Sequence, residues 1–119
     1  MEIKGDNYHV VYHPEHETIM FGGTLRLYGA EGYQPIQDLL NTVAEQKADL
    51  ITLDVRELQF LNSSGINILS KFVIAVRNRK TSCLQIKGTN RFSWQLKSLK
   101  NLQRLMPDLQ LIYDEPDIR

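Results

Sequence analysis

Several features that would tie a chain to a particular environment are missing from this sequence. Cys83 is the only cysteine, so no internal disulfide can form. No apolar run reaches the roughly 20 residues that span a bilayer, and the first residues lack the basic-then-apolar build of a signal peptide. We therefore expect a cytoplasmic protein in a reducing compartment, with Cys83 packed as a reduced thiol.

An excess of charge of either sign is also missing. The chain has 14 Lys and Arg residues against 14 Asp and Glu residues, so no net charge attracts the whole molecule to a polyanion. A basic cluster at residues 77–80 falls at the end of a predicted helix, where cations favour the negative end of the helix dipole. We expect neither nucleic acid nor a membrane as a partner.

Catalytic and metal-binding patterns are lacking as well. His9, His13 and His16 lie close in sequence, but spacing on a strand and turn does not bring their rings together, and no thiol or carboxylate completes a ligand set. No serine-hydrolase motif, P-loop or dinucleotide fingerprint occurs. These observations predict a protein that is not an enzyme, with no metal and no cofactor.

The length and periodicity predict one α/β domain over residues 1–119. Patterns of period two and of helical period alternate along the chain, which predicts an N-terminal antiparallel hairpin followed by parallel strands in a mixed sheet covered mainly by helices. The predicted order is β-β-α-β-α-β-α-β. The strands are expected at residues 7–12, 18–27, 49–55, 82–87 and 109–113, and the helices at 33–46, 63–80 and 92–105.

Two of the predicted helices carry specific expectations. Pro35 suits the first turn of the helix over 33–46, where its missing N–H costs nothing. In the helix over 92–105 we expect Trp94 to be partly packed. The expected inner face of that helix comprises Leu96, Leu99, Leu102 and Leu105.

One junction stands out, between residues 53 and 69, where the sequence predicts a strand, a loop and then a helix. Asn62, Ser63 and Ser64 cluster at the predicted helix start, where their side chains can accept hydrogen bonds from free backbone N–H groups. We expect Ser63 or Ser64 to cap the helix. Capping alone explains much of this cluster.

The same residues resemble the signature of the STAS domain family, in its anti-sigma-factor-antagonist branch. The strand ending in Leu53-Asp54, the hydrophobic pair Phe60-Leu61 and the run Asn62-Ser63-Ser64-Gly65 before an apolar helix match the family's Asp-Ser-Ser/Thr-Gly pattern. The predicted order of elements agrees over the whole chain. The sequence departs from the family at Asn62, which replaces an aspartate, and at Arg26, which stands in place of an acidic residue. It resembles a divergent member.

The resemblance implies a function and a set of residues. Ser63 matches the serine that family members use as phosphoacceptor. The expected partner-binding residues are Asn62, Ser63, Ser64, Gly65 and Asn67.

In the implied partner switch, the unphosphorylated protein binds a serine kinase that doubles as an anti-sigma factor. Phosphorylation of Ser63 ends the complex, because about −1.5 to −2 charges would be desolvated in the interface, and a phosphatase restores it. The alternative is a constitutive interaction or scaffold module in which Ser63 only caps the helix. A small enzyme or nucleotide-binding protein is a third reading, because Ser63 follows the carboxyl end of a strand.

Overall fold

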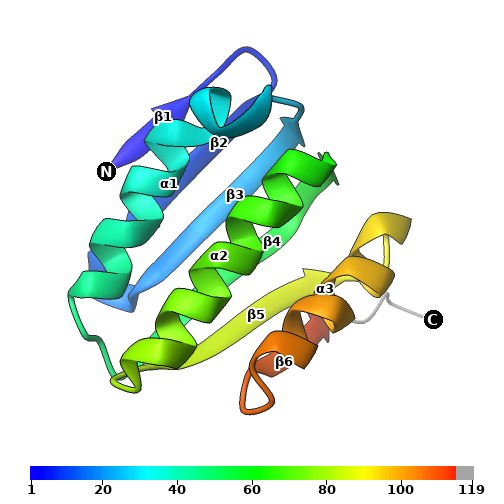
Figure 1. Cartoon of the computed structure of the whole chain (residues 1–119). Coiled ribbons are helices and arrows are strands. Elements are labelled where there is room, and N and C mark those ends of the chain that lie inside the picture. The colour runs from blue at the N-terminus through cyan, green and yellow to red at the C-terminus, as the bar shows by residue number, and fades with distance from the viewer. Residues whose placement is uncertain (115–119) are drawn as a thin grey trace.

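The computed structural model describes residues 1–114, so the last five residues of the expected 1–119 domain lie outside the described residues. Figure 1 shows the arrangement of the chain. The strands are β1 (Glu2–Lys4), β2 (Tyr8–His13), β3 (Thr18–Leu25), β4 (Leu50–Leu61), β5 (Cys83–Thr89) and β6 (Gln110–Asp114). The helices are α1 (Gly29–Glu45), α2 (Ser63–Arg79) and α3 (Ser93–Leu105), with a short 3-10 helix, Pro14–His16, between β2 and β3.

The strands form one sheet in the order in which they occur in the sequence. β1, β2 and β3 pair antiparallel, whereas β3, β4, β5 and β6 pair parallel. This arrangement confirms the predicted α/β class, the N-terminal hairpin and the parallel crossovers. The prediction omitted β1, because three residues are too few to show an alternating pattern.

The three helices lie on the same side of the sheet (Figure 1). Side chains alternate between the two faces of a strand, and in β4 the residues Ile51, Leu53 and Val55 point toward the helices and are fully buried. The opposite face of β4 carries Thr52 and Asp54. No helix among residues 1–114 covers that face.

The strand β4 is longer than predicted and replaces the expected loop. Its second half remains paired with β3 as far as Leu61, opposite Leu25, through two register shifts in the ladder. The shifts fall in the stretch 54–60, most of which was expected to be a loop. As a result, the strand leads directly into α2, and the position of Ser63 is set by the sheet.

The second half of β4 separates from β5 after Asp54, and the side chain of Gln95 fills the gap. Gln95 is fully buried; its Nε2 donates to the carbonyls of Val55 (2.7 Å) and Leu58 (3.0 Å), and its Oε1 accepts from the N–H of Thr89 (2.8 Å). Because Gln95 takes the inner position, the prediction for Leu96 is wrong: its side chain is 42% exposed.

The N-terminal half of α1 also differs from the prediction. The helix begins at Gly29, with the N–H of Gly32 donating to the carbonyl of Tyr28 at 2.9 Å. Pro35 therefore lies inside the helix and not in its first turn, so the carbonyl of Glu31 loses its helical partner. Tyr33, almost fully buried, holds this part of α1 on the core.

Two further expectations concern single residues. Cys83 is exposed, because it is the first residue of β5 and lies on the uncovered face of the sheet, so the prediction of a packed thiol is wrong. Trp94 is partly buried, as predicted, and its indole N–H donates to the carbonyl of Leu58 at 3.1 Å. Within the described residues, no helix combines the length and apolarity required to cross a membrane.

Candidate partner-binding site

Asn62 joins three elements at the start of α2. Its Oδ1 accepts from the N–H of Gly65 at 3.0 Å, so Asn62 is the N-cap of the helix. Its Nδ2 donates to the carbonyl of Leu27 at 2.9 Å, and its N–H donates to the carbonyl of Leu25 at 3.2 Å. The beginning of α2 is thereby fixed to the end of β3 and to the segment that leads into α1.

The hydroxyl of Tyr33 completes this arrangement, although nothing in the sequence pattern pointed to it. It donates to Oδ1 of Asn62 at 2.7 Å, across 29 positions of sequence. Burial raises the pKa of Tyr33 above its ordinary value, and the backbone of Leu27 opposes that rise only in part. The phenol therefore stays neutral and remains a donor at physiological pH.

Steric crowding at this junction favours glycine at position 65. A Cβ at this position would overlap the side chain of Leu61 and would lie 2.7 Å from the Tyr33 hydroxyl. The residue is buried in the first turn of α2. Gly65 therefore contributes to the site by allowing α2 to approach β4 and α1 closely, and its own surface is covered.

Ser63, the first residue of α2, is exposed, and its hydroxyl makes no hydrogen bond with residues 1–114. The expectation that Ser63 or Ser64 caps the helix is wrong, because the Asn62 amide reaches the Gly65 N–H first. Ser64 is half-buried. Asn67 is exposed one turn later. Of the five expected partner-binding residues, Ser63 and Asn67 are exposed.

Aromatic and basic side chains lie beside this junction. Tyr28, next to Leu27, is 92% exposed, the largest value among the big apolar side chains of residues 1–114. Phe60 is partly exposed, and the guanidinium of Arg26 lies 4.7 Å from the centre of its ring. Tyrosine, phenylalanine and arginine are enriched where proteins bind one another, so these residues extend the candidate surface beyond the sequence motif.

Asp54 does not take part in this surface. Burial would raise the pKa of its carboxyl, but hydrogen bonds from the Arg56 side chain (2.8 and 3.0 Å) and backbone outweigh burial and lower the pKa below its usual range. The carboxylate is therefore ionised and paired at neutral pH. Such a group is a poor proton donor or acceptor for catalysis.

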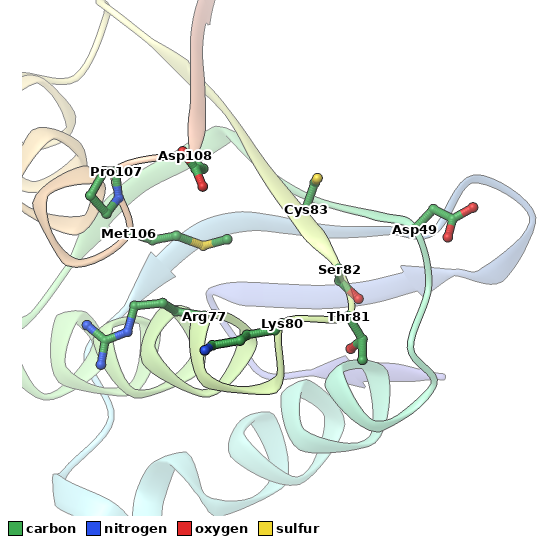
Figure 2. Close-up of a pocket in the computed structure, with 9 residues that line it drawn as sticks. All are labelled: Asp49, Arg77, Lys80, Thr81, Ser82, Cys83, Met106, Pro107 and Asp108. Carbon is green, nitrogen blue, oxygen red and sulfur yellow. The ribbon is translucent and has the colours of Figure 1, made fainter.

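A hollow lies at the carboxyl end of α2, where β4 and β5 begin. It has a volume of about 670 Å³ and is formed by the end of α2, the start of β5 and the connection from α3 to β6 (Figure 2). Arg77 and Lys80 line it together with Asp49 and Asp108. This mixture of charges does not select a ligand of one sign. No group of three or more potential metal ligands occurs within residues 1–114.

The chain has a STAS-like fold, in which a mixed sheet with an antiparallel N-terminal edge is packed against helices. Neither a family model nor a curated relative matches the sequence, but solved structures do. A chain in the crystal structure of the diguanylate cyclase SiaD in complex with its activator SiaC, from Pseudomonas aeruginosa, is similar with a TM-score of 0.71 and 13% identity, covering 98% of this chain and 99% of that chain. SiaC of Pseudomonas aeruginosa itself gives the same TM-score and identity, with 98% of each chain covered.

An anti-sigma factor antagonist from Mycobacterium paratuberculosis is also similar, with a TM-score of 0.55 and 15% identity over 92% of this chain and 82% of that chain. At these identities the likeness concerns the fold. It agrees with the STAS resemblance seen in the sequence.

Proposed function

We propose that this chain is a regulatory protein-binding module whose complex is controlled by phosphorylation of Ser63. The proposal rests on the different hydrogen bonding of two neighbours. Asn62 caps α2, whereas the Ser63 hydroxyl is exposed and makes no hydrogen bond with residues 1–114. A serine needed only as a cap would be engaged with the backbone. The constitutive module with Ser63 as cap is therefore the weaker alternative.

The position of Ser63 also suits a phosphate. The N–H groups of Gly65 and Ile66 are already taken by Asn62, which leaves the amides of Ser63 and Ser64 without an acceptor among residues 1–114. Free amides and the positive end of the helix dipole stabilise an anion there. A phosphate would therefore leave the fold intact while placing negative charge on the binding surface.

The partner proposed first is a serine kinase that acts as an anti-sigma factor, with a phosphatase to reverse the modification. The fold of the Mycobacterium paratuberculosis antagonist and the Asn62-Ser63-Ser64-Gly65 motif support this choice. A second candidate is activation of a signalling enzyme, because SiaC, the activator in the complex with SiaD, has the higher TM-score. In either case the chain itself performs no catalysis.

Affinity capture from host lysate with mass spectrometry tests the proposal, with wild type and Ser63→Asp as baits. Ser93→Asp is the matched control, because Ser93 is also exposed and is also the first residue of a helix, α3. We expect a kinase or another signalling enzyme to be held by wild type and Ser93→Asp and lost by Ser63→Asp. Equal retention by all three baits contradicts the switch and favours the constitutive module.

A further inference from the structure

Although the total charge is zero, acidic and basic residues are distributed unevenly along the chain. Between residues 58 and 107 there is no Asp or Glu, whereas the same stretch contains nine Lys and Arg residues. All of the acidic residues therefore lie in the rest of the chain. This signal is readable in the sequence, but a count over the whole chain does not reveal it.

The structure places the cations of α3 on one outward face. Lys97, Lys100 and Arg104 follow one another at spacings of three and four, so they lie along the same side of the helix. All three are exposed. The opposite side of α3 is the buried one, formed by Gln95, Leu99 and Leu102.

The neighbouring helix α2 extends this surface. Arg77 is exposed and donates to the carbonyl of Leu105 at 3.0 Å, which joins the ends of α2 and α3. We call Arg77, Lys97, Lys100 and Arg104 the cationic face. None of the four forms an ion pair with residues 1–114.

The third helix of the same layer has the opposite charge. α1 contains Glu31, Asp38 and Glu45 and no Lys or Arg. Among residues 1–114, only Arg79 forms an ion pair with α1, at 3.9 Å from Glu45. The three helices lie side by side on one face of the sheet (Figure 1), and this layer carries acidic residues on α1 and basic residues on α2 and α3.

We propose that the cationic face docks an acidic surface of a protein partner. The inference deepens the proposed function, because it names the chemistry of that partner, and it rests on the proposed function for the link to Ser63. Complementary charge accelerates association and fixes orientation. Only the part of the partner that contacts α2 and α3 needs to be acidic.

The observations favour a protein over a nucleic acid. A long polyanion that crosses the helical layer would meet the carboxylates of α1, and nucleic-acid-binding domains are generally basic overall, whereas this chain is neutral. Leu96, 42% exposed, lies one turn from Lys100 and offers an apolar contact beside the cations. An apolar contact within a polar surround is typical of protein interfaces.

The cationic face also gives phosphorylation a physical route to act. Ser63 begins α2, and a phosphate there adds about −1.5 to −2 charges to a surface whose attraction depends on positive charge. Ser63 lies at the amino end of α2 and Arg77 near its carboxyl end, so the phosphate would repel an acidic partner that extends along α2. Release then needs no change in the fold.

The direct experiment is an NMR titration of the full chain with a synthetic peptide of Glu and Leu residues. The Lys-for-Glu counterpart peptide and duplex DNA serve as comparison probes. We expect the acidic peptide to shift amide signals of α2 and α3, and the triple variant Lys97→Gln, Lys100→Gln, Arg104→Gln to bind it about tenfold more weakly, since three exposed charges are removed. The matched control is Glu31→Gln, Asp38→Asn, Glu45→Gln on α1, which should bind the acidic peptide at least as tightly as wild type does, because only negative charge is removed.

Three results would overturn the inference: signals that shift away from α2 and α3, tighter binding of duplex DNA than of the acidic peptide, or self-association that the α1 variant abolishes. The same variants, used as baits for the captured partner, separate this inference from the switch. If the α3 variant retains the partner and Ser63→Asp loses it, the switch stands and the cationic face is wrong. If the α3 variant loses the partner and Ser63→Asp retains it, the face stands and the switch is wrong.

Discussion

The two ends of α2 differ in how the chain is held. At the amino end, Asn62 uses its side chain and backbone to join β3, α1 and α2, and Gly65 allows these elements to touch. At the carboxyl end, Lys80 has a left-handed backbone (φ 58°) beside a hollow of about 670 Å³. The end that carries the candidate site, the closed end, is held by these hydrogen bonds, and the open end, with the hollow of about 670 Å³, carries no motif. This contrast fits a site that recognises a protein surface and not a small molecule.

The largest expected effect is at the closed end, from Gly65→Ala. The new methyl group would overlap Leu61 and crowd the Tyr33 hydroxyl, and overpacking of this kind typically costs about 1–3 kcal/mol. We expect the free energy of unfolding, measured by urea denaturation, to fall toward the upper part of that range. Ser64→Ala, one position earlier, should change it by less than about 0.5 kcal/mol. Equal effects would show that the junction is not tightly packed.

Asn62→Ala should cause the next largest loss of stability. It removes the cap, which contributes about 0.5–2 kcal/mol, and it deprives the Tyr33 hydroxyl and the Leu27 carbonyl of their partner. We expect a loss of about 2 kcal/mol in thermal or urea unfolding. Ser63→Ala should lose less than about 0.5 kcal/mol, because its hydroxyl makes no hydrogen bond with the described residues. A larger loss for Ser63→Ala would restore the serine as a structural cap.

At the open end of α2 we expect a substitution that raises the free energy of unfolding. Lys80 follows α2 in the left-handed region, which glycine adopts without steric cost. Lys80→Gly should therefore raise the free energy of unfolding by about 0.5–1 kcal/mol. The control Arg79→Gly, at the last helical residue, should lower it by up to about 1 kcal/mol. If both variants are destabilised alike, the end of α2 is held by contacts that the backbone conformation does not reveal.

The smallest effect should come from Cys83, which is exposed beside the hollow. We expect iodoacetamide to alkylate it in the folded protein nearly as fast as in urea-unfolded protein, followed by mass spectrometry. Alkylation should change the stability by less than about 0.5 kcal/mol, because no core contact is lost. Strong protection of the thiol from alkylation in the folded protein would contradict this prediction, because it would mean that Cys83 is covered in solution.

The fold was predictable because its signals are local and periodic. The apolar positions of α2 and the alternation of β4 predicted the order of elements, whereas Ser63 was proposed from the resemblance of Asn62-Ser63-Ser64-Gly65 to the STAS signature. The end of β4, the cap and the inner face of α3 were not predictable, since each depends on a distant partner. Pairing with β3 extends β4 to Leu61, Leu27 and Tyr33 select Asn62, and the separation of β4 from β5 draws Gln95 inward.

The hydrogen bond from Trp94 to the carbonyl of Leu58 gives the molecule an internal optical probe. Because the chain has one tryptophan, its emission arises from a single place, on the stretch of β4 that leads to Asn62. Changes in the polarity around the indole, or in this hydrogen bond, should alter the wavelength and intensity of that emission. Events at Ser63 can therefore be followed in solution, in real time and without any attached dye.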